Sequence, residues 1–246
     1  MKKKKYVRLL TKLRYELVES SESVVVLAGG MSVLLDKNKI NNYIFKNNSI
    51  VISANHSYDF IDKIDYTFFG DPDVFLSKYT SIRGTPIISV RVKDRLKDRI
   101  NNMFWNRFIK KKKVCFEVFT RGKKHGNKMK KWKINKDGTF PTLKYSSTGF
   151  AAMCISLLFR PKEVLVAGLD GPEFDTPKEK RGSKLPKFDF NGRMKKYKSV
   201  RDSIEKKNVL EFKVIPLLQS KNVNIVCVPS SKLYGIDKKK YNIVLL

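Results

Sequence analysis

The sequence has no apolar run long enough to cross a membrane as a helix, which takes roughly 18 residues or more. Its first residues, Met1 to Tyr6, are basic like the start of a signal peptide. The apolar stretch and small-residue cleavage site of a signal peptide do not follow them. These absences argue against an integral membrane protein and a secreted one. The expected location is therefore cytoplasmic.

Cysteine is also scarce. The three cysteines are Cys115, Cys154 and Cys227, which are scattered along the chain, each inside an apolar stretch. An odd, scattered set provides neither a disulfide framework nor the close pairs of a zinc site. We expect all three to be buried thiols of the core.

Acidic residues are few, with 23 Asp and Glu against 52 Lys and Arg and a formal net charge of +29. Such an excess attracts nucleic acid, anionic membranes or phosphorylated substrates. The alternative is that a Lys- and Asn-rich composition reflects an AT-rich genome and a solvated surface. Hydrophobic residues make up 41% of the chain and aromatic residues 11%, which is enough for a core and argues against disorder.

Short apolar runs rich in β-branched residues recur along the chain, as in strands that are buried on both faces of a parallel sheet. These runs lie at residues 23–28, 49–54, 65–69, 86–90, 114–119, 164–168 and 223–228. Helical segments are predicted at 150–159, after hydroxyl residues typical of an N-cap, and at 199–220. The alternation predicts an α/β fold with a Rossmann-like, doubly wound, mostly parallel sheet.

The expected organisation is a basic N-terminal helix over residues 1–22 and a single nucleotide-binding domain over residues 23–246. The helix has one apolar stripe, which either packs on the domain or lies on a membrane surface. Two basic insertions interrupt the domain, at about residues 107–133 and 178–198. The first carries twelve Lys or Arg against one acid, and the second nine against two. The second is expected to be a long loop that follows a strand end, where such loops commonly serve as a lid or a substrate-binding insertion.

Glycines and polar residues follow the predicted strands, at the edge where parallel sheets bind ligands. The turn at residues 28–32 can hold a phosphate with backbone N–H groups. The turn at residues 146–149 offers hydroxyls and N–H groups of a helix start, where an anion is favoured. Ordinary turns and caps use the same residue types. The candidate nucleotide-binding residues are Gly29, Gly30, Ser32, Asn55, Asp71, Ser147, Thr148 and Gly149.

Acidic residues and histidine supply the candidates for metal binding and proton transfer. Asp71 and Asp73 form an Asp-x-Asp at a strand end, which could hold Mg²⁺ or Mn²⁺ across a diphosphate. The alternative is a turn with Pro72 at its second position. Asp170 and His56 are candidate catalytic residues, because each could accept a proton near the predicted site.

Residues 147–155 and 162–170 resemble bacterial lipooligosaccharide sialyltransferases. They also resemble a wider superfamily that holds flagellin-modifying glycosyltransferases and an archaeal pterin pyrophosphokinase. Those enzymes have Thr-Ser-Gly, an apolar helix with Met-Cys, Lys-Glu, a strand and Ser-Gly-Ile-Asp. This chain has Ser-Thr-Gly, Met-Cys, Lys-Glu and Ala-Gly-Leu-Asp in the same order. Their Gly-x-Gly-Pro-Ser turn is similar to residues 28–32, their strand-end Asn to Asn55, and their Asn-Pro turn to Asp71-Pro72.

The resemblance spans roughly residues 24–75 and 145–230. It implies a glycosyltransferase that takes its sugar from a nucleotide, with a CMP-sugar favoured and no metal required. The nucleotide would face Gly30, Ser32, Asn55, Asp71, Thr148 and Gly149.

Two departures from the family bear on catalysis. Pro172 stands where the sialyltransferases carry a tyrosine, and no histidine occurs at 178–201, where their general base lies. Another group would then act as base, and the candidates are Asp170, Glu173, Asp175, Asp189 and His56.

Two other functions stay open from the sequence. One is a phosphoryl transfer like that of the pterin pyrophosphokinase, with a divalent metal at Asp71 and Asp73. The other is nucleic-acid binding on a degenerate transferase fold. The expected partners are the nucleotide-sugar donor and, through the basic segments, nucleic acid or an anionic membrane or glycolipid surface. A peripheral position at a membrane is compatible with the latter.

Overall fold

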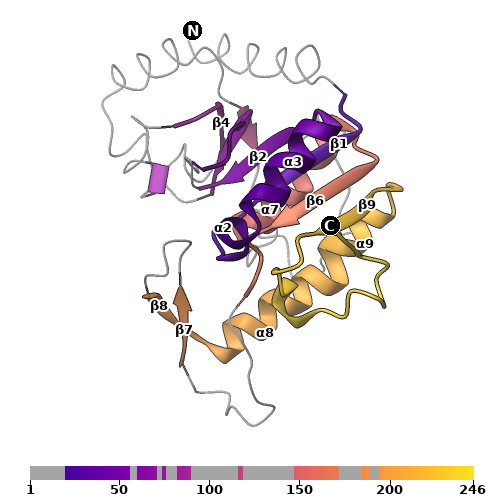
Figure 1. The fold of residues 1–246 in the computed structure, drawn as a ribbon. Coiled ribbons are helices and arrows are strands. Elements are labelled where there is room, and N and C mark those ends of the chain that lie inside the picture. Colours follow the sequence, from indigo (N-terminus) through magenta and orange to yellow (C-terminus); the bar gives the residue numbers. More distant parts are fainter. Residues whose placement is uncertain are drawn as a thin grey trace, which may run out of the picture.

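A computed structural model gives the fold and describes residues 20–55, 60–70, 74–75, 82–89, 116–118, 147–171, 184–188 and 194–246. Its main sheet consists of β1 (Ser23–Leu27), β2 (Ile50–Ala54), β3 (Tyr66–Phe69), β4 (Thr85–Ser89), β5 (Phe116–Val118), β6 (Glu163–Ala167), β9 (Asn224–Cys227) and β10 (Val244–Leu245). The strand order is β10-β9-β6-β1-β2-β3-β4-β5, and every pairing is parallel. The predicted α/β, doubly wound sheet is confirmed (Figure 1).

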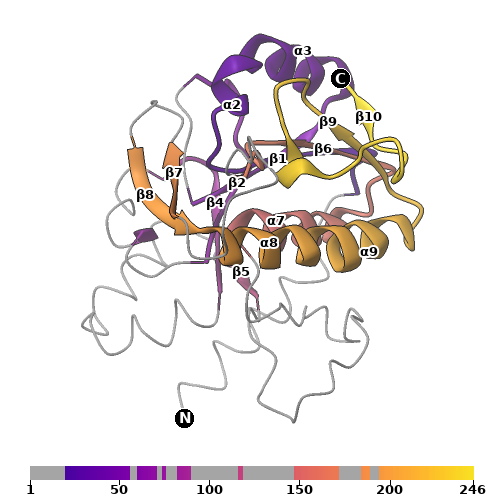
Figure 2. The ribbon, with the colours of Figure 1, turned by 90° about the horizontal axis from the view of Figure 1, so that it is seen from below.

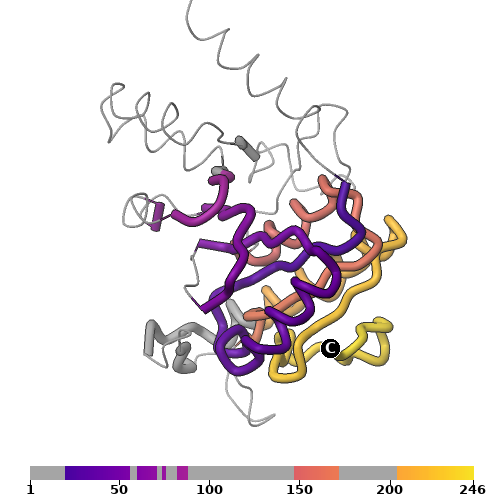
Figure 3. The backbone as a smooth tube through the Cα atoms, turned by 45° about the horizontal axis from the view of Figure 1, so that its top comes forward, coloured from indigo at the N-terminus to yellow at the C-terminus, as the bar shows by residue number. Residues whose placement is uncertain are grey.

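The first strand, β1, lies in the middle of the sheet, and the later strands are added on both sides of it. From β1 it runs through β2, β3 and β4 to β5, and it then returns to the other side of β1 to form β6. Figure 3 shows the later residues, in gold, continuing beside the salmon segment that contains β6. The winding therefore reverses between β1 and β6, and a crevice at the strand C-termini is expected there.

Helices cover both faces of the sheet. On one face lie α2 (Ser32–Leu35) and α3 (Lys37–Asn47). On the other lie α7 (Thr148–Ser156), followed by a 3-10 turn η1 (Leu157–Phe159), and the long helix formed by α8 (Val200–Val209), η2 (Leu210–Val214) and α9 (Ile215–Gln219). Figure 2 shows the two layers above and below the strands. A last 3-10 turn, η3, spans Leu233–Gly235.

Alternating side chains of the strands feed two cores, because successive residues of a strand point to opposite faces. Val24 and Val26 of β1 pack in the cluster that contains α7 and α9. Val25 and Leu27 pack in the cluster that contains α3. All four side chains are fully buried, which explains why the strand is apolar at every position.

The long helix contains a turn that its sequence pattern does not reveal. Residues Leu210–Val214 form a π-helix immediately before Pro216, which stands in the first turn of α9. Proline has no N–H to donate to the carbonyl four residues earlier, so regular α-helical bonding is interrupted there. The wider turn keeps Leu210 and Val214 completely buried against the core.

The segment 178–198, expected to be a loop, contains strands. β7 (Lys184–Phe188) and β8 (Met194–Ser199) form a two-stranded antiparallel sheet, which corrects that expectation. The predicted helix at 1–22 lies outside the described residues except for residues 20–22, and the basic insertion at 107–133 is described only at 116–118. Cys154 and Cys227 are buried thiols, as predicted. Within the described ranges, no helix has the length and hydropathy that crossing a membrane requires.

Candidate functional site at the switch point of the sheet

The turn after β1 and the turn after β6 are joined by hydrogen bonds around Asp170. One carboxylate oxygen, Oδ2, accepts from the Ser32 N–H at 2.9 Å, and Oδ1 accepts from the Ser32 hydroxyl at 2.5 Å. Ser32 Oγ accepts in turn from the Gly168 N–H at 2.8 Å. The Gly30 N–H donates to the Gly168 carbonyl at 2.9 Å. We call Gly30, Ser32, Gly168 and Asp170 the β1–β6 clasp.

The β1–β6 clasp uses groups that the sequence assigned to a ligand. Ser32 is only 1% exposed, and its hydroxyl both donates and accepts within the protein. The N–H groups of Gly30 and Ser32 donate to protein oxygens instead of pointing to a phosphate. A Cβ on Gly30 would lie 2.3 Å from Asp170 Oδ2, so this close approach requires glycine. The clasp therefore shapes the site, and Gly29 and Met31 are the half-buried residues of the turn.

A second group of bonds, around Asn55, joins β2 and β3 to the start of α7. Asn55 Nδ2 donates to Thr148 Oγ1 at 3.0 Å, and Asn55 Oδ1 accepts from the Gly70 N–H at 3.2 Å. The Asn55 N–H donates to the Phe68 carbonyl at 2.7 Å. Asn55 has a φ of 66°, a left-handed conformation that asparagine tolerates better than most residues. We call Asn55, Gly70 and Thr148 the β2–α7 clasp.

The first turn of α7 is rich in hydrogen-bond donors. Ser147 is the N-cap, and its Oγ accepts from the Phe150 N–H at 3.2 Å. Thr148 Oγ1 accepts from Asn55, so the hydroxyl hydrogens of both residues can be donated outward. The N–H groups of Thr148 and Gly149 belong to the first turn, where an α-helix offers no acceptor. The helix dipole adds a partial positive charge at this end.

The same turn of α7 lies directly against the switch point. A Cβ on Gly149 would lie 2.5 Å from a methyl carbon of Leu169 and 2.9 Å from Cβ of Ala28. Ala28 and Leu169 come directly after β1 and soon after β6. The absence of a side chain at Gly149 thus brings the donors of α7 to the place where the winding of the sheet reverses.

A segment that the sequence did not single out completes this edge of the sheet. After β9, the Ser230 N–H donates to Asp36 Oδ2 at 2.9 Å, and the Tyr234 N–H donates to the Asp170 carbonyl at 3.3 Å. Pro229, Ser230 and Ser231 follow β9 as polar turns follow the other strands, so the rule that located the other turns could have found this one.

The remaining predicted residues lie outside the described part of the chain. These are the candidate bases His56, Glu173, Asp175 and Asp189 and the candidate metal ligands Asp71 and Asp73. Among the described residues, no group of three or more His, Cys, Asp or Glu side chains is placed to hold a metal ion.

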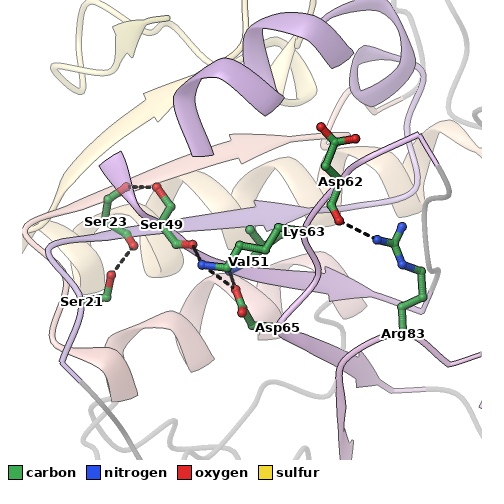
Figure 4. A network of polar contacts seen from close by, with 8 residues as sticks. All are labelled: Ser21, Ser23, Ser49, Val51, Asp62, Lys63, Asp65 and Arg83. Atoms are coloured by element: carbon green, nitrogen blue, oxygen red, sulfur yellow. Dashed lines mark hydrogen bonds and ion pairs between the residues drawn. The ribbon is translucent and has the colours of Figure 1, made fainter. Parts of the chain in front are cut away.

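A pocket of about 360 Å³ lies at the opposite edge of the sheet, at the N-terminal ends of β2, β3 and β4. Lys63 Nζ donates to the Ser49 carbonyl at 2.8 Å and lies 3.6 Å from Asp65 Oδ2 (Figure 4). The same Asp65 oxygen accepts from the Val51 N–H at 2.8 Å. The charged groups of this pocket are thus paired with each other and with strand backbone, which favours a structural role.

The fold and the site together define a Rossmann-like α/β protein with a donor-rich switch point. The chain matches no family model, no curated protein and no solved structure.

Proposed function

We propose that this chain is a glycosyltransferase that binds a nucleotide-activated sugar, preferably a CMP-sugar, at the switch point between β1 and β6. The observation that carries the proposal is the position of the α7 N-terminus, whose hydroxyl and N–H donors lie beside the ends of β1, β2 and β6. A nucleotide phosphate is the anion that such a set of donors suits. The resemblance to sialyltransferases rests on the same segment, residues 147–170, and supports the same function.

In the proposed reaction, an acceptor hydroxyl attacks the anomeric carbon of the sugar. The bond between that carbon and the phosphate oxygen breaks, and the nucleotide leaves with the electron pair. Donors of Ser147, Thr148 and Gly149 offset the charge that develops on the phosphate. The hydroxyl proton passes to a base. Both oxygens of Asp170 already accept from Ser32, so we assign Asp170 to positioning and the base to His56 or Asp175.

The acceptor in this proposal is polyanionic, and the net charge of +29 supports it. The same charge favours the second candidate function, nucleic-acid binding without turnover. Turnover of a CMP-sugar separates the two functions.

The test of the proposed function is a thermal-shift screen of the full chain against CMP, CMP-sugars, other nucleoside monophosphates and ATP, in EDTA and in Mg²⁺. A ligand at a hundred times its Kd stabilises the folded state by about 2.7 kcal/mol. We expect CMP to raise Tm in EDTA. Thr148→Val keeps the size of the side chain but removes the hydroxyl donor and also the acceptor of Asn55 Nδ2, and it is expected to weaken CMP binding about tenfold, or 1.4 kcal/mol.

Thr67→Val is the matched control for this substitution. Thr67 is buried in β3 and donates to the Arg83 carbonyl at 2.7 Å, away from α7. Its replacement should lower Tm and leave the affinity for CMP unchanged. A screen in which no nucleotide or nucleotide-sugar shifts Tm would overturn the proposal. A response to ATP that requires Mg²⁺ would favour phosphoryl transfer instead.

A further inference from the structure

The segment after β9 bonds to Asp170 of the β1–β6 clasp and to the junction between α2 and α3, which follows the clasp on the β1 side. Ser230 donates its N–H to Asp36, the residue between α2 and α3 on the β1 side. Four residues later, Tyr234 donates its N–H to the carbonyl of Asp170 on the β6 side. Asp36 is 6% exposed and Tyr234 is also 6% exposed, so both contacts are inside the protein. A third strand end is thereby tied to the turn after β6 and to the junction between α2 and α3.

The ring of Tyr234 supports two parts of the site at once. It packs edge-on against Phe150, in the first turn of α7, with 5.5 Å between the ring centroids. A Cβ added to Gly171 would lie 2.8 Å from Cδ1 of the same ring. Gly171 has a φ of 72°, so the turn after Asp170 passes tightly over the ring. Such aromatic pairs contribute about 0.5–1.5 kcal/mol beyond the area they bury.

The backbone at this point is held in an unfavourable conformation. Leu233 has a φ of 43° and Tyr234 a φ of 57°, both in the left-handed region. Residues other than glycine pay on the order of 1–3 kcal/mol for such a conformation, which persists only where surrounding contacts determine it. The contacts here are those of Tyr234 with Phe150, Gly171 and Asp170.

We propose that Tyr234 is a positioning residue of the site, whose ring sets the Asp170–Gly171 turn and the first turn of α7 at the spacing that ligand binding requires. The identity of the ligand rests on the function proposed above, whereas the contacts of the ring do not. Phenylalanine supplies the same ring, and leucine does not. The effect is therefore expected from Tyr234→Leu and not from Tyr234→Phe.

The experiment uses the full chain and two measurements. Hydrogen exchange is followed in peptides that cover residues 147–156 and 164–171, and CMP affinity is measured by titration. Tyr234→Leu is expected to speed exchange at least tenfold in both peptides and to weaken CMP binding at least tenfold. Tyr234→Phe is expected to stay within twofold of the wild type in both. Leu218→Ala, a fully buried residue of α9, is the control for a general loss of stability.

Three results distinguish the outcomes. If Tyr234→Leu behaves as Leu218→Ala does at equal loss of Tm, Tyr234 is an ordinary core residue and the proposal is wrong. If Tyr234→Phe changes the exchange rates and the CMP affinity as much as Tyr234→Leu does, the effect comes from the hydroxyl, and the proposed role of the ring is wrong. If the wild type binds no CMP, the proposed function fails and the exchange data still decide the role of Tyr234. Phe150→Leu removes the partner ring and is expected to give the same exchange pattern, should Tyr234→Leu not fold.

Discussion

At the scale of single residues, the polar groups at the strand ends divide into those that build the site and those that face outward. Ser32 and Asp170 satisfy each other, and Asn55 bonds to Thr148 and Gly70. Buried polar groups need partners, and removing one partner costs more than the bond itself is worth. The residue types at strand ends were predictable from the sequence. Their partners were not, because the Ser32–Asp170 and Asn55–Thr148 bonds join residues 138 and 93 positions apart in the chain.

Tyr234 gives a residue-scale prediction about pH. Burial, and after it the charge of Asp170, raises the pKa of its phenol from 10.0 to about 12. The folded state therefore keeps a proton that the unfolded state loses between these values. Its contribution to stability is complete below pH 10 and falls as the pH rises toward 12, by up to about 2–3 kcal/mol.

Tyr234→Phe has no such proton, so the comparison isolates the effect. Tyr43, whose pKa is also raised by burial and by a hydrogen bond to Glu163, is common to both proteins and cancels. The free energies of unfolding of the wild type and of Tyr234→Phe are measured in urea between pH 8 and pH 11.5. The difference between them should be constant below pH 9.5. Above pH 10 the wild type should lose stability relative to the variant. A difference that stays constant over the whole range would mean that the phenol is not desolvated.

At the scale of elements, the sequence predicts what apolar patterning controls. The central strands are buried on both faces, so their apolar runs locate them within two residues, and a hydroxyl before an apolar run locates the start of α7. The β7–β8 pair was not predicted, because its strands carry lysines and a proline in place of an apolar run. The π-helical turn before Pro216 was not predicted either, because one extra residue in a turn barely alters the apolar periodicity of a helix.

The N-cap of α7 gives an element-scale prediction that separates folding from ligand binding. Aspartate caps a helix as well as serine does, and a negative charge at a helix N-terminus is favourable. Ser147→Asp should therefore keep or raise Tm. The same charge would repel a phosphate at the first turn of α7, so CMP affinity should fall at least tenfold.

Ser147→Asn is the control for this prediction, because asparagine caps equally well without the charge. It should retain most of the affinity for CMP. Titration of both variants by calorimetry, with Tm measured in parallel, checks the pair. Equal affinities for the two variants would place the phosphate away from the start of α7.

At the scale of the whole molecule, the fold and the charge pose separate questions. The sheet and its two helical layers bury the apolar residues of the two described cores and place the switch point. The net charge of +29 has no part in that architecture, since the two core clusters consist of apolar side chains. Charge of this size destabilises a compact state by self-repulsion, and an anionic partner would relieve that cost.

The last prediction is that the chain binds polyanions through its basic segments and that salt weakens the binding steeply. Twelve Lys or Arg against one acid at residues 107–133 make this the first segment to test. Each phosphate that a cation neutralises contributes a slope of about −0.9 to the dependence of log K on log salt for duplex DNA. Replacing Lys110, Lys111, Lys112 and Lys113 by Ser should make the slope shallower by about 2 to 4.

A control with the same loss of charge replaces Lys206, Lys207, Lys238 and Lys239 by Ser and should change the slope by less than 1. Affinities for duplex DNA, single-stranded RNA and anionic vesicles are measured at salt concentrations from about 25 mM to about 200 mM, a range that includes the physiological ionic strength. The polyanion with the highest affinity is the preferred partner. If no polyanion binds at the lowest salt, or if the salt slope decreases equally in both variants, the lysines are a general property of the surface. The proposal of a polyanionic acceptor is then wrong.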